Sequence, residues 1–590
     1  MKKQDIIILV ALFALWLAWP IIDRQVIKKY FFHDSAVPAA AEPASDVPGA
    51  VTDAALGEAP ATLLADETTE AAPAKVEAEP EEDALPEETA VLENEAIKLT
   101  VSSRGASVKS VEFKERDYRQ TVDPDSGPLV LDFDGVPALA YVDWAGLSAR
   151  QQFAMTVAED GRSVRFERAT PDGLKFVRTI SLDDRYMAKV TDEMANESAA
   201  AVRLPARFIQ TGMMQSLVGD GSVRGIAFLG VDTLSPGGEG VKYWGNKLVK
   251  QFDVERKERN LAKPPVTLDW SLAKPVHWAA AKNKYFVQIL APENGGENSV
   301  IHAVRDVSPQ EMANPAARVK TAVVKEVSSR ILLPEFNVEP GTTFTLPMEY
   351  YVGPKKYSEL NRYGQRFVDV MEFGMWAPVG KVLLATLNAL HRVFRNYGVA
   401  IMLLTIIIRV VFWPITRKST ESMKKMSEIQ PLVAAVREKY KDNAQKQQQE
   451  IMALYKEHKV NPLGGCLPTL IQIPVFIALF VVLRSAIELR FAPFLWVRDL
   501  SQPENLLAGL LPIPLNILPI IMAVTMVWQQ KLTPSAGDAS QQKMMMVMPV
   551  MMLVIFYNFA AGLALYWTTN QCLMIAQQLM MHRKKKAAGA

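Results

Sequence analysis

Long apolar stretches dominate the C-terminal third of this chain, and another lies close to its N-terminus. Residues 397–416, 460–483, 506–530 and 544–581 carry at most one charge each. About 20 apolar residues cross a bilayer as a helix, and the last stretch is nearly twice that length, so we divide it near residues 560–562. Residues 6–22 read as an uncleaved signal anchor, because no small-residue cleavage pattern follows them. The pattern predicts six transmembrane helices, at 1–32, 397–416, 462–485, 506–530, 544–560 and 563–581, the last five forming the core.

Between residues 91 and 355 the pattern changes to short alternating runs such as SVRFERAT and TFTLPMEYYV, separated by turn sequences. This period of two predicts a large antiparallel β-sandwich. Residues 33–90 are rich in Ala, Pro, Asp and Glu, which predicts a disordered acidic linker. Residues 368–394 are predicted to form an interfacial amphipathic helix, with Leu383, Leu387 and Phe394 on one stripe. A helix packed on the β-domain is the alternative.

The distribution of basic residues predicts the orientation in the membrane. Residues 417–459 contain ten Lys or Arg, and residues 582–590 form a basic tail. Basic residues beside spans mark the cytoplasmic side, so both termini are predicted in the cytoplasm and the β-domain in the periplasm. Residues 417–459 suit a helical hairpin with its bend at Asp442-Asn443, which is either a solvated linker or a docking site for a cytoplasmic partner. The candidate docking residues are Lys424, Lys425, Arg437 and Lys439.

Composition excludes several classes of function. The 65 basic and 64 acidic residues give a net charge of +1, which argues against direct binding of nucleic acid. Two cysteines and six histidines leave little for a metal site, and phosphate-loop, serine-hydrolase and zinc-protease motifs are missing. We therefore expect no cofactor, no metal and no enzymatic activity.

Arg409 is the candidate for chemistry inside the membrane. It lies about 12 Å along the helix from Arg417, in the inner half of its span, and no Asp or Glu lies in any apolar stretch to pair with it. It either faces water and polar groups or extends to lipid phosphates. Thr405, four residues earlier, shares its face. The possible partners on other spans are Gln472, Asn558, Thr568, Thr569, Asn570 and Gln571.

The residues themselves leave two classes of function open at this point. One is a small-solute transporter with a sugar-binding-like periplasmic domain, although the repeats typical of transporters are not detected. The other is a structural anchor for the β-domain. Ion-coupled transporters generally need acidic residues inside the membrane to carry protons or cations, and the apolar stretches contain no Asp or Glu, so ion-coupled transport is disfavoured. A cationic cavity open to water would instead attract acidic and polar parts of a polypeptide.

Several longer segments resemble the YidC/Oxa/Alb family of membrane protein insertases. They include TIIIRVVFWPITRKSTESMKKMSEIQP, EIMALYKEHKVNPLGGCLPTLIQIPVFIALF, ELRFAPFLWVRDLS, QQKMMMVMPVMM and LALYW. The order of anchor, linker, β-domain and five-span core is similar to the Gram-negative form. The resemblance implies a multi-pass protein of the bacterial inner membrane that inserts and helps fold nascent membrane proteins. It also implies a supersandwich like that of sugar mutarotases for the β-domain.

The resemblance further implies where substrates pass. The family's groove arginine falls on Arg409 and its threonine on Thr405, and Tyr566-Trp567 stands where members often have two tyrosines. Arg484 departs from the family pattern. Partners implied are the lipid bilayer, the Sec translocon, the ribosome and the receptor of the signal recognition particle. The predicted groove comprises Arg409, Thr405, Gln472, Asn558, Tyr566, Trp567 and Thr568. The predicted hydrophobic slide comprises Ile471, Ile473, Phe476, Met548, Met552 and Phe556.

Overall fold

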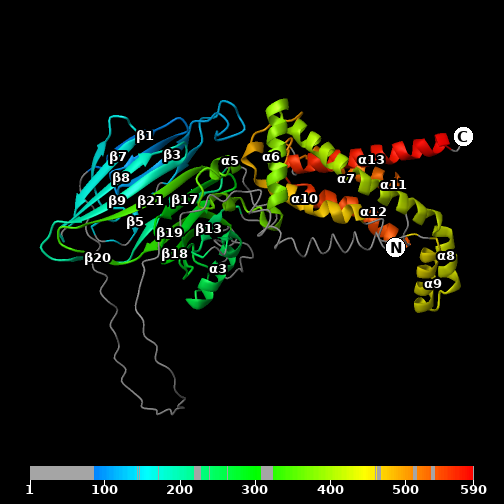
Figure 1. The fold of residues 1–590 in the computed structure, drawn as a ribbon, viewed down its shortest axis with the longest axis horizontal. Coiled ribbons are helices and arrows are strands. Elements are labelled where there is room, and N and C mark those ends of the chain that lie inside the picture. The colour runs from blue at the N-terminus through cyan, green and yellow to red at the C-terminus, as the bar shows by residue number, and fades with distance from the viewer. Residues whose placement is uncertain are drawn as a thin grey trace, which may run out of the picture.

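The computed structural model describes residues 86–588 apart from 134, 143, 145, 171, 218–227, 238–239, 262, 307–322, 459, 461–466, 509, 511–513 and 533–538. The predicted anchor at 1–32 and nearly all of the predicted linker at 33–90 lie outside the described residues. A β-rich domain and a bundle of helices stand side by side (Figure 1).

Within the described residues, four antiparallel sheets build the β-rich domain, as the alternating pattern predicts. The nine-stranded sheet has the order β14 (Val241–Tyr243), β13 (Gly230–Leu234), β16 (Trp278–Lys282), β17 (Phe286–Pro292), β21 (Thr343–Pro354), β9 (Met187–Asn196), β8 (Leu174–Leu182), β7 (Ser163–Ala169) and β6 (Ala154–Val157). The six-stranded sheet has β15 (Thr267–Ser271), β18 (Asn298–Arg305), β19 (Val324–Leu333), β11 (Arg207–Gln210) and β5 (Tyr141–Val142), with β12 (Met214–Gln215) beside β19.

The two smaller sheets complete this domain. One contains β1 (Thr89–Glu93), β2 (Ile97–Ser102), β3 (Ser107–Phe113) and β4 (Val130–Asp132), and the other pairs β10 (Val202–Leu204) with β20 (Phe336–Val338). Among the described residues of this domain, the long helix is α3 (Gly245–Glu258), which buries Leu248 and Phe252. Alternation in β9 buries Val190 and Met194, so one face of the strand meets the core.

A short connection leads from β21 to the helices. It contains α5 (Tyr357–Leu360) and two 3₁₀ turns, η2 (Phe367–Met371) and η3 (Gly374–Trp376), before α6 (Ala377–Phe394) begins. The predicted interfacial helix at 368–394 therefore starts later, with Pro378 in its first turn. Figure 1 shows α6 lying across the end of the bundle rather than along it, which is the orientation expected of an interfacial helix.

In the described part of the chain the bundle contains α7 (Tyr397–Glu428), α10 (Leu467–Ser485), α11 (Ile517–Leu532), α12 (Ala539–Phe556) and α13 (Ala561–Ala588). α7 packs against α6 and α13, and α11 packs against α12 and α13. The break between α12 and α13 lies at residues 557–560, just before the predicted position at 560–562.

Several helix limits differ from the predicted spans, most clearly those of α7 and α11. α7 continues beyond residue 416 because no breaker follows at once, and Arg417 pairs with Glu421 one turn later at 3.1 Å. α11 begins at Ile517 rather than at 506. Pro514 precedes it, and Glu504 accepts hydrogen bonds from the first backbone N–H groups, at 3.0 and 2.6 Å.

Length and composition single out one helix as able to cross a membrane among the residues described. It is the Tyr397–Ser419 part of α7, whereas the apolar stretches Gln472–Ser485, Ile517–Leu532 and Val547–Phe556 are shorter. The count of six spans therefore stays a prediction.

The predicted cytoplasmic segment forms the expected hairpin. Its helices α8 (Gln430–Lys439) and α9 (Ala444–Glu457) meet at Asn443, whose side chain accepts a hydrogen bond from the Lys446 N–H at 2.9 Å. The hairpin and the end of α13 lie at the end of the bundle away from the β-rich domain (Figure 1). This shared position agrees with the predicted orientation.

The β-rich domain is joined to the bundle by buried polar contacts. Between β16 and β17, the Tyr285 hydroxyl donates to Ser501 Oγ at 2.7 Å, and Lys284 Nζ donates to the Ser501 carbonyl at 3.1 Å. Arg484, at the end of α10, lies over the rings of Phe228 and Phe480, 5.8 and 5.4 Å from their centroids. The ring of Phe228 belongs to the β-rich domain, so Arg484 is part of this junction.

Candidate functional site

Arg409 lies inside the bundle, with 8% of its surface exposed. It borders a cavity of about 20 Å³, which is room for roughly one water molecule. Three helices supply the walls, since Gln472 comes from α10 and Asn570 from α13. The lining residues are Ile408, Arg409, Phe412, Ile415, Thr416, Gln472 and Asn570.

The guanidinium of Arg409 is not satisfied by the described protein groups. Its Nε and Nη2 atoms are buried and make no hydrogen bond with a described residue. Three polar atoms on α13 are also buried and make no hydrogen bond with a described residue: Thr568 Oγ1, Gln571 Oε1 and Gln577 Nε2. Such groups are costly to bury unless water or a ligand completes their hydrogen bonds. We therefore expect water inside the bundle to complete the hydrogen bonds of these groups.

The structure brings several predicted groove residues together. Thr405 is buried one turn before Arg409, and its hydroxyl donates to the Ile401 carbonyl at 2.7 Å. Gln472 Nε2 donates to the Tyr566 hydroxyl at 3.4 Å, which links α10 to α13. These side chains come from three helices, so no sequence window contains them all.

Besides Trp567, which is described below, two predicted groove residues lie away from the Arg409 cavity. Asn558 is exposed in the turn between α12 and α13 and does not line the Arg409 cavity. Thr568 lines a separate apolar cavity of about 540 Å³. Asn570 stands in the wall instead. The sequence names it among the possible partners of Arg409 but not in the predicted groove, and it follows Tyr566 by four residues, a spacing that places both on one face of α13.

An aromatic cluster lies between α10, α12 and α13. Trp567 packs edge-to-face on Phe476 at 5.0 Å between ring centroids and lies 5.4 Å from Phe556. Phe476 and Phe556 are themselves 6.4 Å apart. The indole of Trp567 therefore belongs to the apolar contact between α10 and α12, not to the polar wall.

The predicted slide residues differ in how exposed their side chains are. Ile473 and Met548 are exposed, Met552 is half-buried, and Phe556 is buried. The side chain of Ile471 lies outside the described part. Further exposed apolar side chains on α10 and α12 are Ile477, Val547, Val550, Met551 and Val554. Both helices thus present apolar surface beside the aromatic cluster.

The predicted docking cations lie on or next to the hairpin. Lys425 and Lys439 are exposed and Arg437 is half-buried, while the side chain of Lys424 lies outside the described part. Lys439 Nζ is 5.4 Å from the centroid of the Tyr440 ring. Among the residues described, no group of three or more His, Cys, Asp or Glu could hold a metal ion.

Comparison with known proteins covers almost the whole described chain. Residues 89–386 match the family model described as the YidC periplasmic domain, and residues 389–588 match the model described as the 60Kd inner membrane protein. The membrane protein insertase YidC of Syntrophobacter fumaroxidans is 32% identical over 474 residues, which is 76% of this chain and 78% of that protein. The same-named protein of Pelobacter propionicus is 41% identical over 271 residues, 45% of this chain and 47% of that one.

A solved structure of an active YidC insertase aligns with 84% of this chain and 94% of its own, at 19% identity and a TM-score of 0.33. A galactose mutarotase-like protein from Lactobacillus casei aligns with 45% of this chain and 100% of its own, at 12% identity and a TM-score of 0.29. TM-scores this low carry no argument about the family of this chain, so the family assignment follows from the sequence matches. The chain belongs to the family of the membrane protein insertase YidC.

Proposed function

We propose that this protein inserts newly made membrane proteins into the bacterial inner membrane and that the cavity beside Arg409 receives the polar part of the substrate. Family membership supports the activity. The buried guanidinium with two unsatisfied nitrogens supports the site. This second observation carries the proposal, because a buried cation without an acidic partner is stable in a span only where water or a polar ligand reaches it.

Distance along α7 shows how the cavity would help. Arg409 follows Tyr397 by twelve residues, or about 18 Å of helix, against a hydrocarbon core of about 30 Å. If Tyr397 marks the outer boundary, water at Arg409 removes more than a third of the apolar distance. A polar flank that enters from the cytoplasm then has a shorter barrier to cross.

The exposed apolar faces of α10 and α12 would take the hydrophobic part of the substrate. The rings of Phe476 and Phe556 join these helices, with 6.4 Å between their centroids. A substrate helix can lie on Ile473 and Met548 while its polar flank remains near Arg409. It then leaves sideways into lipid.

The full topology has six spans, with both termini in the cytoplasm and the β-rich domain in the periplasm. The hairpin lies on the cytoplasmic side in this arrangement, and Lys425, Arg437 and Lys439 offer cations there for the ribosome or the receptor of the signal recognition particle. Passage to the Sec translocon would use the lateral faces of the bundle.

Replacement of Arg409 tests the proposal. Arg409→Ala should abolish insertion of a small Sec-independent phage coat protein into proteoliposomes, and Arg409→Lys should retain part of it because the charge remains. Arg417→Ala is the matched control, since it removes an exposed cation from the same helix outside the cavity. Full insertion by Arg409→Ala, or uptake of a labelled solute without insertion, would contradict the proposal.

A further inference from the structure

A second polar cavity, with a volume of about 280 Å³, lies where the β-rich domain meets the outer end of the bundle. This volume is close to the lower end of the range for small-molecule sites, about 300–1,000 Å³. Four segments that are distant in the sequence form it: the loop after β3, the start of α5, the turn from α6 to α7, and the connection between α10 and α11. The charged side chains that line it are Asp117, Lys356, Arg395, Glu488 and Arg490, with His391 beside them.

Two cations and one carboxylate of this cavity make no ion pair within the described protein. Lys356 and Arg395 make no ion pair with a described residue, nor does Asp117. Glu488 is half-buried: the Asn388 amide donates to its Oε1 at 3.5 Å, while its Oε2 is buried and makes no hydrogen bond with a described residue. Burial raises the pKa of Glu488, whereas burial lowers the pKa of His391. The cavity therefore keeps an excess of positive charge and one free carboxylate, on Asp117.

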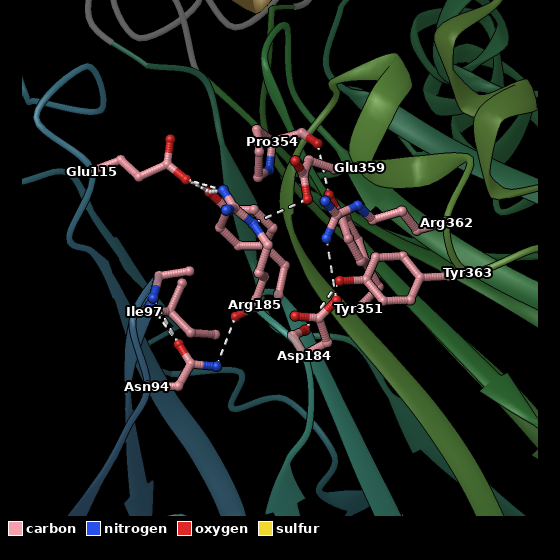
Figure 2. A network of polar contacts seen from close by, with 12 residues as sticks. Asn94, Ile97, Glu115, Asp184, Arg185, Tyr351, Pro354, Glu359, Arg362 and Tyr363 are labelled. Atoms are coloured by element: carbon pink, nitrogen blue, oxygen red, sulfur yellow. Dashed lines mark hydrogen bonds and ion pairs between the residues drawn. The ribbon is translucent and has the colours of Figure 1, made fainter.

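Ion pairs and a hydrogen bond next to the cavity fix the positions of two of its walls (Figure 2). Arg185 forms ion pairs with Glu115, close to Asp117, and with the buried Glu359 of α5, at 3.1 Å in the second case. The Tyr186 hydroxyl also donates to Glu115 at 2.5 Å. These contacts fix the loop after β3 relative to α5, which begins directly after Lys356.

The membrane-side wall is equally well defined. The rings of His391 and Tyr397 stack at 3.7 Å with an interplanar angle of 5°. Asn396 Nδ2 donates to the Pro493 carbonyl at 3.3 Å, which ties the start of α7 to the connection between α10 and α11. Contacts within the protein thus define the cavity, and binding would require little rearrangement.

The residues that neighbour the lining in the sequence, here called the rim of the cavity, include exposed apolar side chains. Val393 and Phe394, next to Arg395, are 72% and 50% exposed, and Leu495, close to Pro493, is 75% exposed. α6 lies across the bundle at the same level (Figure 1). Apolar side chains beside cations are typical of the interface between hydrocarbon and headgroups. The rim therefore fits a position in the outer leaflet.

We propose that this cavity binds the headgroup of an outer-leaflet phospholipid, with the phosphate at Lys356 and Arg395 and an amine of the headgroup at Asp117. Lysine and arginine are the usual partners of phosphate in proteins. A headgroup that carries both a phosphate and an ammonium matches the two signs of charge better than a purely anionic one. The site is separate from the Arg409 cavity, although its place in the outer leaflet follows from the proposed topology.

Native mass spectrometry of the full-length protein in detergent tests this assignment. The added probes are phosphatidylethanolamine, phosphatidylglycerol and inorganic phosphate. The double variant Lys356→Gln/Arg395→Gln should bind phosphatidylethanolamine at least tenfold more weakly, because two charge-assisted contacts are lost. Arg392→Gln is the matched control, since it removes an exposed cation of α6 that does not line the cavity, and it should stay within about twofold of the unmodified protein.

Two further comparisons identify the ligand. Asp117→Asn should shift the preference from phosphatidylethanolamine towards phosphatidylglycerol. Unchanged lipid binding by the double variant would overturn the site, and binding of inorganic phosphate without lipid would overturn the lipid assignment. Thermal unfolding of each variant in lipid-free detergent shows that it is folded. Insertion of the coat protein is measured separately, so that failure of the proposed function can be told from failure of this site.

Discussion

A buried ion pair in the β-rich domain gives the sharpest prediction of stability. Arg178 on β8 and Asp192 on β9 face each other in the strand register, and both side chains are fully buried. Arg178 donates to both carboxylate oxygens, at 2.7 and 2.6 Å, and also to the carbonyls of Ala106 and Leu139. The Tyr141 hydroxyl completes the network with a 2.5 Å bond to Asp192.

Arg178→Met should destabilise the domain by about 3–5 kcal/mol, because it leaves the carboxylate of Asp192 buried without its partner. This is a large part of the ~5–15 kcal/mol by which a domain is usually stable. The double variant Arg178→Met/Asp192→Leu should recover more than half of the loss, since it removes the second charge as well.

Hydrogen exchange of the β8 and β9 amides in the full-length protein measures the effect. The loss corresponds to a rise of roughly 10²–10⁴ in the opening equilibrium of these strands. Arg203→Met is the control, because its ion pair with Glu335 is exposed, and it should leave the exchange unchanged. The reasoning would be refuted if the β8 and β9 amides exchanged equally fast in Arg178→Met and in the unmodified protein. It would also be refuted if they exchanged as fast in the double variant as in Arg178→Met.

Two other predictions concern the junction and the pH dependence. Tyr285→Phe removes the hydroxyl that bonds Ser501, and it should weaken the attachment of the β-rich domain by about 0.5–1.5 kcal/mol, seen as faster exchange around Ser501 with β8 unaffected. Burial raises the pKa of Asp232 to about 7, although Lys282 Nζ lies 2.6 Å away. A raised folded-state pKa means that this group favours the folded state most below its unfolded value of about 4. Stability should therefore fall as pH rises from about 4 to 7, and Asp232→Asn should flatten this part of a urea-unfolding profile; an unchanged slope would contradict the assignment.

The sequence predicted the type of most elements because their patterns are local. Alternation indicated the antiparallel sheets, and the apolar stretches indicated the helices of the bundle. Helix limits were less well predicted where the cause is a distant contact. α11 begins at Ile517 because Glu504, thirteen residues earlier, folds back to bond its first turn, and apolar content alone does not show this.

The candidate site was predicted in part for the same reason. Arg409 and Thr405 share one helix, so their spacing places them together, and Gln472 and Tyr566 do meet across the bundle. Asn558 was chosen for its polarity, but the turn after α12 carries it away from the cavity. Arg484 could not be understood from the sequence, because its partner ring on Phe228 belongs to the β-rich domain.

Water at the Arg409 cavity can be measured directly by thiol labelling. The assay replaces Cys466 and Cys572 by Ser, places a cysteine at Gln472 in the cavity wall, and adds a membrane-impermeant maleimide from the cytoplasmic side. A thiol must ionise to react, so it reacts only where water reaches it. Ile477→Cys, on the apolar outer face of α10, is the control. The account predicts rapid labelling of Gln472→Cys and almost none of Ile477→Cys, whereas equally slow labelling at both positions would contradict a hydrated cavity.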